Sequence, residues 1–202
     1  MKIQYGWLIM LEDFNRVDLH VNSINFAKSD ILSDKMCKVL LDKDNLFTET
    51  PESTDLGYYV KRPTKAEFSC ECNEFWWCLN NAAKGLWREE IPYIMDMLND
   101  IIRPNLTNVL SWKIGIENNF SCSTGKSGKY MYQFLPENTW KKFLETYPNS
   151  NIEHIWKSVF IMCDLFSETA KKVASKLNFN YNENDEFAAR KYLNYVYQAP
   201  KK

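Results

Sequence analysis

The chain has 202 residues, of which 45% are hydrophobic and 15% aromatic, a composition typical of a folded protein with one good core or two small ones. Its 25 basic and 26 acidic residues give a net charge of −1, so no nucleic-acid partner and no anionic membrane surface is expected from charge. The sequence contains no run of about 18 apolar residues, so we expect no membrane-spanning helix.

The six cysteines indicate neither a disulfide framework nor a metal site. No export signal is recognisable, so the sequence predicts a cytoplasmic protein whose thiols stay reduced. Cys70, Cys72 and Cys78 have the spacing C-x-C-x5-C, but no second pair accompanies them and both histidines are distant in the sequence. We therefore expect no structural zinc.

The first quarter of the chain has the pattern of a hairpin followed by a helix. Residues 3–10 and 16–21 are predicted to be strands, and residues 23–32 a short helix. The second strand alternates apolar and polar side chains, which places Asp18 on the face away from the core. Such an acid is often only solvent-facing. Residues 49–62 contain Pro, Gly, Ser and Thr without periodicity and predict a connection between two domains.

Residues 63–91 predict a long amphipathic helix. Thr64 provides a start signal, and Glu67 stands three residues later, as in a capping box. At about 100° per residue, the apolar side chains fall on one side, which is the spacing of a helix packed against a core. This side consists of Phe68, Cys72, Phe75, Trp76, Leu79, Ala82, Ala83 and Leu86.

The opposite side of this helix is polar but includes one large aromatic residue. Glu74, Asn81, Lys84 and Arg88 fall together, with Trp77 between them. Charged helix faces are commonly no more than solvated surface. A Trp is costly to leave uncovered in water, and this favours the alternative that the face meets a ligand.

The rest of the chain is predicted to be mainly helical. Pro92 is expected to kink or restart the helix, because it lacks an N–H group and crowds the preceding turn. The cleanest periodicity lies between residues 151 and 177, and its apolar stripe is expected to be core. The helices are predicted over residues 92–103, 105–118, 136–147, 151–177 and 185–197.

One loop, STGKSGK at residues 123–129, has residues suited to phosphate binding. Its two glycines allow close backbone approach, and Lys126 and Lys129 supply positive charge. It is not a Walker A loop, which needs a glycine where Phe120 stands and a strand before it. The alternative is a structural turn between helices.

Taken together, several segments resemble the streptomycin (aminoglycoside 6-) adenylyltransferase family. They occur in the same order along the chain: YGWLIMLEDFNRVDL, KVLLDKD, KRPTKAEF, NEFWW, KGLWREE, SWKIGIE and STGK. The resemblance implies an α+β, mostly α-helical fold. Residues 1–60 would be the C-terminal part of a polymerase-β-like nucleotidyltransferase α/β domain. Residues 63–198 would be a helical bundle domain that binds substrate and nucleotide.

By resemblance, the reaction is transfer of AMP from Mg·ATP to the 6-hydroxyl of streptomycin, which confers antibiotic resistance. Small molecules, ATP and an aminoglycoside, are then the partners. Asp18 in RVDLHV aligns with the third carboxylate of these enzymes. The resemblance makes it a catalytic residue and a ligand of Mg²⁺, because carboxylates hold the metal against the triphosphate and accept the proton of the attacking hydroxyl.

The resemblance also suggests which residues contact the nucleotide. Its phosphates are the expected target of Gly125, Lys126 and Lys129. Lys84 and Arg88 are candidates for the triphosphate or for structural ion pairs.

Three further residues are candidates for binding the drug. Streptomycin carries guanidinium groups, for which carboxylates are natural partners. Glu74 and Glu90 are the candidates for that contact, and Trp77 is expected to stack on a ring or on a guanidinium.

The family pattern also includes a Gly-Ser motif and an Asp-x-Asp pair, upstream of the segments matched here. The chain begins after the positions at which the family carries them. The alternative function is therefore a catalytically inactive remnant that acts as a binding or interaction module, and we expect little or no turnover. A hairpin with open edges also favours a homodimer.

Overall fold

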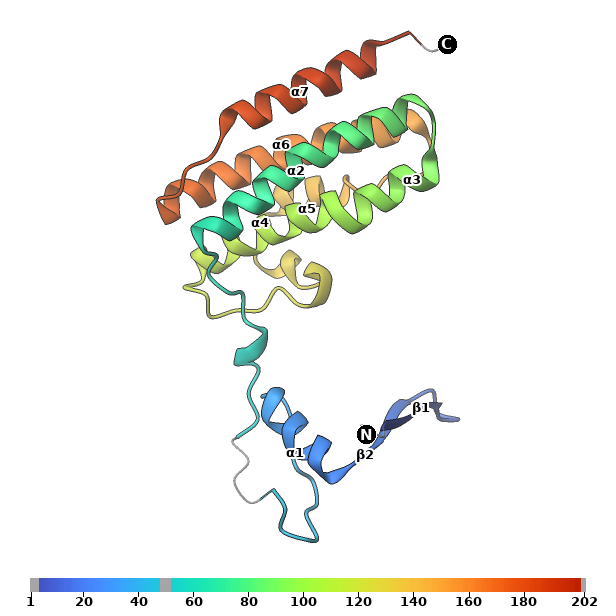
Figure 1. Cartoon of the computed structure of the whole chain (residues 1–202), viewed down its shortest axis with the longest axis vertical. Helices are drawn as coiled ribbons and strands as arrows, with labels where there is room; N and C mark the ends of the chain where they lie inside the picture. Colours follow the sequence, from blue (N-terminus) through green and yellow to red (C-terminus); the bar gives the residue numbers. More distant parts are fainter. Residues whose placement is uncertain (1–3, 48–51, 201–202) are drawn as a thin grey trace. The chain divides into compact units, whose positions relative to one another are not determined.

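The computed structural model describes residues 4–47 and 52–200. The chain divides into two compact units, Met1–Tyr58 and Tyr59–Lys202, each of which is described by itself. The first contains a β-hairpin and a short helix, and the second is helical (Figure 1). The boundary falls in the predicted connection at residues 49–62, of which residues 49–51 lie outside the described part.

The N-terminal unit has the predicted elements. Its strands pair antiparallel, with Trp7 opposite Leu19 and Leu8 opposite Asp18. The side chain of Ser23 accepts a hydrogen bond from the N–H of Phe26 and so caps the helix that follows. The elements are β1 (Gln4–Met10), β2 (Arg16–Asn22), α1 (Ile24–Ser33) and the 3₁₀ turn η1 (Leu56–Tyr58).

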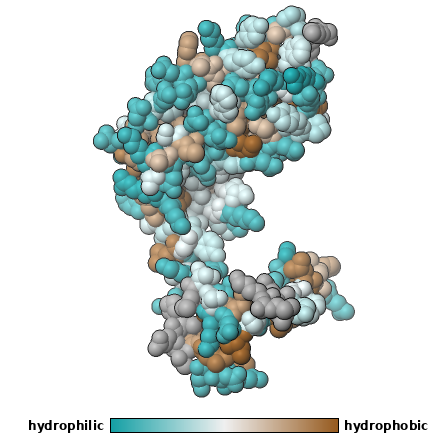
Figure 2. All heavy atoms as spheres, viewed as in Figure 1, coloured by the Kyte–Doolittle hydropathy of each residue, from teal (hydrophilic) through white to brown (hydrophobic). Residues whose placement is uncertain are grey.

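The expectation that the apolar side of β2 packs on a core is wrong for the described structure. Val17, Leu19 and Val21 are between 41% and 52% exposed, and Trp7, which pairs with Leu19 on the same face, is 50% exposed. A sheet of only two strands has too little area to bury one face by itself. Brown apolar atoms are accordingly visible at the surface of this unit (Figure 2).

The C-terminal unit is a helical bundle in which α2 packs against α7 and α4, and α6 packs against α4 and α5. The predicted helices are all present, with ends shifted by a few residues. The regular elements are α2 (Lys65–Trp87), α3 (Ile91–Asp96), the π-helical segment η2 (Met97–Ile102), α4 (Arg103–Glu117), the 3₁₀ turns η3 (Lys126–Gly128) and η4 (Met131–Gln133), α5 (Glu137–Leu144), α6 (Ile152–Leu177) and α7 (Glu183–Gln198).

The predicted capping box of α2 is confirmed. Thr64 Oγ1 accepts from the N–H of Glu67 at 3.2 Å, and Glu67 Oε2 accepts from the N–H of Thr64 at 2.7 Å. Helix α2 ends before Glu89, whose φ of +59° reverses the chain. Pro92 then stands in the first turn of α3, where its missing N–H costs nothing.

Helices α3 and α4 are joined through η2 into one continuous helical run. Six of its fully buried apolar residues recur every fourth position, and at about 100° per residue each such step overshoots a full turn by about 40°. A π-helical turn has more residues per turn and therefore winds back part of this drift. The row consists of Ile94, Leu98, Ile102, Leu106, Leu110 and Ile114.

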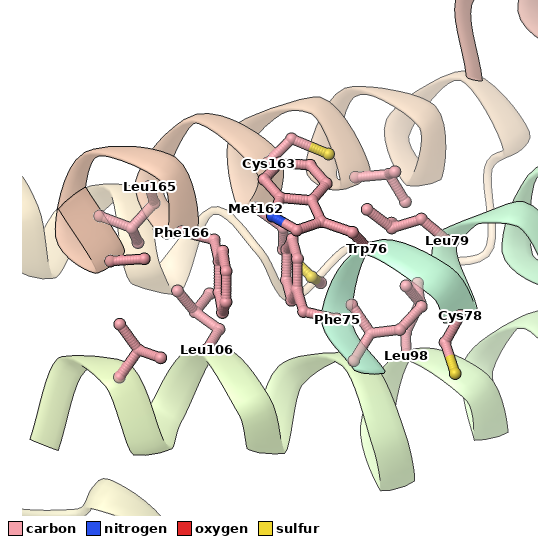
Figure 3. Close-up of a cluster of buried hydrophobic side chains, with 14 of the residues drawn as sticks. Phe75, Trp76, Cys78, Leu79, Leu98, Leu106, Met162, Cys163, Leu165 and Phe166 are labelled. Carbon is pink, nitrogen blue, oxygen red and sulfur yellow. The ribbon is translucent and has the colours of Figure 1, made fainter. Parts of the chain in front are cut away.

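The centre of the bundle is aromatic. The rings of Phe75 on α2 and Phe166 on α6 stack with centroids 3.7 Å apart and an angle of 4° between their planes. Trp76 meets both rings edge-on, at 5.0 and 5.7 Å. Side chains from η2 and α4 close the cluster (Figure 3). The predicted apolar side of α2 is thus the core side.

Candidate functional site

A groove lies between α2 and α7 on the outside of the core. It contains a cavity of about 480 Å³, and Trp77, which is 67% exposed, forms part of its wall. The other lining residues supply aromatic rings, amides, one cation and one carboxylate. They are Asn73, Trp76, Asn80, Lys84, Asp185, Ala188, Ala189 and Tyr192.

A smaller cavity of about 190 Å³ adjoins the first along the same pair of helices. Lys84 and Tyr192 line both cavities, and Arg88 lines the smaller one. Three of the predicted site residues, Trp77, Lys84 and Arg88, therefore lie along one groove. We call these two adjoining cavities the α2–α7 groove.

The two predicted acids are not among the residues that line this groove. Glu74 Oε1 accepts a hydrogen bond from Cys78 Sγ at 3.3 Å, and Glu90 pairs with Arg88 at 3.9 Å. The second contact joins two exposed side chains and contributes little to stability. Asp185, in the first turn of α7, provides the carboxylate of the groove instead. Sequence reasoning missed it, because its pairing with α2 is not visible in a local pattern.

A hydrogen-bonded network holds α7 beside α2 behind the groove. Trp76 Nε1–H donates to the hydroxyl of Tyr181 at 3.0 Å, and this hydroxyl donates to Glu186 Oε2 at 3.0 Å. Burial, followed by the charge of Glu186, raises the pKa of Tyr181. The guanidinium of Arg190 lies 5.4 Å from the centroid of the Trp76 ring and donates to Glu186. These contacts therefore hold α7 against α2, the two helices that line the groove.

The predicted phosphate loop borders a different cavity, of about 510 Å³ beside α4. Gly125 lines this cavity together with Ser127 and Gly128. Lys126 and Lys129 are exposed and are not among its lining residues, and the ammonium of Lys129 lies 4.8 Å from the centroid of the Tyr130 ring. The loop thus contributes backbone and the two hydroxyl residues Thr124 and Ser127 to the cavity, and the cation there is Arg103, which sequence reasoning missed.

Asp18 lies in the N-terminal unit, exposed on β2. Both of its oxygens bind the guanidinium of Arg16, with Nε–Oδ1 at 2.7 Å and Nη2–Oδ2 at 2.9 Å. The hydrogen bond from Arg16 holds the pKa of Asp18 below its usual range.

The described residues do not fit a magnesium site by themselves. Within residues 4–47 and 52–200, no group of three or more His, Cys, Asp or Glu side chains is placed to hold a metal ion. Asp18 alone offers one carboxylate, already engaged by Arg16, whereas Mg²⁺ in such sites is shared among carboxylates and phosphates. Among the helices of this described part, none is long and apolar enough to span a bilayer.

Comparison with known proteins identifies relatives across nearly the whole chain. The family profile described as Streptomycin adenylyltransferase matches residues 1–196. The aminoglycoside 6-adenylyltransferase of Campylobacter jejuni is 36% identical over 198 residues, which cover 98% of this chain and 67% of that protein. The protein of the same name from Bacillus subtilis (strain 168) is 36% identical over 194 residues, which cover 96% of this chain and 68% of that protein.

A crystal structure of an aminoglycoside 6-adenyltransferase from Bacillus subtilis superposes with a TM-score of 0.66 and 34% identity. The superposition covers 97% of this chain and 72% of the Bacillus subtilis chain. The chain thus spans roughly two thirds to three quarters of the length of these relatives. The chain belongs to the streptomycin adenylyltransferase family.

Proposed function

We propose that the chain is an aminoglycoside adenylyltransferase, which transfers AMP from ATP to the 6-hydroxyl of streptomycin. The observation that carries the proposal is the family match over residues 1–196. The α2–α7 groove supports it, because its size lies within the range of small-molecule sites. Its exposed indole, its amides and its single carboxylate suit a polar, cationic sugar.

In the groove, Trp77 is proposed to stack on a ring or a guanidinium of the drug, and Asp185 to pair with a guanidinium. Lys84 and Arg88, which line the smaller cavity, stay candidates for the triphosphate or for ion pairs such as that of Arg88 with Glu90. Glu74 stays a candidate at the rim, since it lies on the same polar side of α2 but does not line the groove.

Two predicted contacts lie elsewhere in the helical unit. Glu90 stays a candidate for the drug through its contact with Arg88, which lines the smaller cavity. Gly125, Lys126 and Lys129 are proposed to meet nucleotide phosphates at the loop beside α4.

The proposed chemistry assigns one role to the N-terminal unit. The oxygen of the drug hydroxyl forms a bond to the α-phosphorus of ATP, the bond to pyrophosphate breaks, and Asp18 accepts the hydroxyl proton. Asp18 must first leave Arg16, whose hydrogen bonds lower its pKa and so make it a weaker base. The family resemblance implies that ATP is used with Mg²⁺, but no step is assigned to a metal here.

The test is the mass of streptomycin after incubation with ATP and Mg²⁺, because the proposal requires that AMP be added to the drug, even at a low rate. Asp18→Asn should abolish the product without changing the thermal unfolding curve. Asp13→Asn is the matched control, because Asp13 is an exposed acid of the same hairpin that bonds to Asn15. Normal turnover by Asp18→Asn would remove Asp18 from the mechanism.

One observation favours a second candidate, a binding module without turnover. Both oxygens of Asp18 are occupied by Arg16, as in a purely structural ion pair. On this view streptomycin or ATP raises the melting temperature, but no AMP-bearing drug appears. Product formation above the rate of Asp18→Asn excludes this candidate. A homodimer through the open edges of the hairpin stays a prediction, which sedimentation velocity tests.

A further inference from the structure

Arg103, the first residue of α4, is a buried cation with uncharged partners. It is 3% exposed, and none of the ion pairs found in the described part of the chain involves it. Its guanidinium donates to the hydroxyl and carbonyl oxygens of Thr146 and to Asn99 Oδ1, and it lies 4.0 Å from the centroid of the Tyr147 ring. A buried charge is costly unless an opposite charge compensates it.

The guanidinium also retains donors for a ligand. A guanidinium has more N–H groups than the three that these hydrogen bonds use. Arg103 lines the cavity of about 510 Å³ beside α4. Among the described residues that line this cavity, none is acidic.

The neighbours of Arg103 add further donors. Because Asn99 Oδ1 accepts from Arg103, the NH₂ group of the Asn99 amide is left to donate. The hydroxyls of Ser127 and Thr124 also line the cavity, and Thr124 Oγ1 lies 3.2 Å from Ser111 Oγ. A cation surrounded by donors, with no acid beside it, is the chemistry of an oxyanion site.

The loop that borders this cavity depends on glycine for its backbone conformation. Gly125 has a φ of +72°, and a Cβ there would lie 2.5 Å from Tyr130 Cδ2, so no other residue fits without rearrangement. The N–H of Tyr130 donates to the carbonyl of Thr124 at 2.9 Å and closes the turn. Backbone without side chains can therefore approach a ligand closely at this point.

We propose that the cavity beside α4 is an oxyanion site, in which Arg103, Asn99 and Ser127 bind a phosphate group. The phosphate has two possible sources, free inorganic phosphate or pyrophosphate, and the phosphate chain of a nucleotide. The proposal does not rest on adenylyl transfer, since the residues that bind the anion all lie in the helical unit and no turnover is needed to detect it.

The experiment is isothermal titration of the full chain with inorganic phosphate and with pyrophosphate at constant ionic strength. Arg103→Gln should weaken binding by about tenfold or more, since a charge-assisted contact is lost. That variant also loses contacts to Thr146, so a second variant is needed. Asn99→Asp places a carboxylate beside Arg103. The carboxylate still accepts the hydrogen bond from the guanidinium, and its negative charge compensates the charge of Arg103. We expect this variant to keep the native melting temperature and to lose anion binding by a similar factor.

The matched control is Asn184→Asp, which adds the same charge at an exposed residue of α7 that lines neither this cavity nor the α2–α7 groove, and should leave phosphate affinity unchanged. Competition with ATP distinguishes the two sources of the phosphate group. If ATP displaces bound pyrophosphate, the site takes the phosphate chain of a nucleotide. If pyrophosphate binds and ATP does not displace it, the site takes free phosphate or pyrophosphate. The proposal is overturned if neither anion binds the native chain. It is also overturned if Asn99→Asp binds phosphate as tightly as the native chain does.

Discussion

Glu186 is the residue whose charge most directly holds α7 on the bundle. Its carboxylate, 12% exposed, accepts from Ser167 at 2.9 Å, Tyr181 at 3.0 Å, Arg190 at 2.9 Å and Lys171 at 3.0 Å. Glu186→Gln keeps the shape of the side chain and removes the charge that faces the two cations.

The size of the effect follows from these two contacts. A hydrogen bond to a charged group contributes about 1.5–3 kcal/mol, and the contact with Lys171 lies at the low end because that side chain is 44% exposed. We therefore expect Glu186→Gln to lower the free energy of unfolding by about 3 kcal/mol. For a protein of this size, that lowers the melting temperature by roughly 6–12 °C, measured by circular dichroism.

The effect should also depend on pH. Burial raises the pKa of Glu186, but the bonds from Ser167, Lys171, Tyr181 and Arg190 outweigh it and leave the pKa below its usual value. A carboxyl with a lowered folded pKa adds stability that is complete above the unfolded pKa and is lost as the pH falls through the folded pKa. The difference in melting temperature between native and variant should therefore be full at neutral pH and shrink from about pH 5 downward.

Glu168→Gln is the matched control on α6. Glu168 is 53% exposed and pairs with Lys172 at 2.7 Å, so its loss should change the free energy of unfolding by less than about 0.5 kcal/mol. If the difference in melting temperature between the native chain and Glu186→Gln stayed constant as the pH was lowered into the acid range, the effect could not be assigned to the charge of Glu186. Equal losses in the two variants would refute the role of burial.

Three further outcomes are expected. Trp77→Ala should change the free energy of unfolding by less than about 0.5 kcal/mol, because the indole is 67% exposed. The same substitution should abolish the rise in melting temperature that streptomycin causes. An unchanged rise would exclude Trp77 from the site. Gly125→Ala should destabilise the fold by about 1–3 kcal/mol in urea denaturation, whereas Gly57→Ala, whose Cβ meets nothing within 4 Å, should be nearly neutral. A thiol reagent at about pH 8 should label exposed Cys70 and spare Cys163, whose pKa burial raises to about 12; early labelling of Cys163 in mass spectra would contradict a closed core.

The helices could be predicted because their signals are local. The capping box at Thr64 and the apolar stripe of α2 each depend on residues within a few positions of one another, and both are present in the structure. The same holds for the hairpin, whose two predicted strands are present and pair antiparallel. What the alternation could not reveal was the exposure of both its faces, since that depends on what lies against the sheet.

The candidate site was predicted in part. Trp77, Lys84 and Arg88 lie along the α2–α7 groove because one helix face determines their positions. Asp185 and Arg103 were missed, since each becomes significant only through packing between elements far apart in the sequence.

The wide turn at η2 makes the number of residues between 97 and 102 as important as their identity. Deleting one of them would rotate everything downstream by about 100° about the helix axis. Arg103 would then leave its cavity, and the buried row of α4 would turn away from α6 in the same movement. Changes of length in this protein should therefore be tolerated in the exposed loop at residues 149–150, whereas residues 97–102 should accept only replacement at constant length.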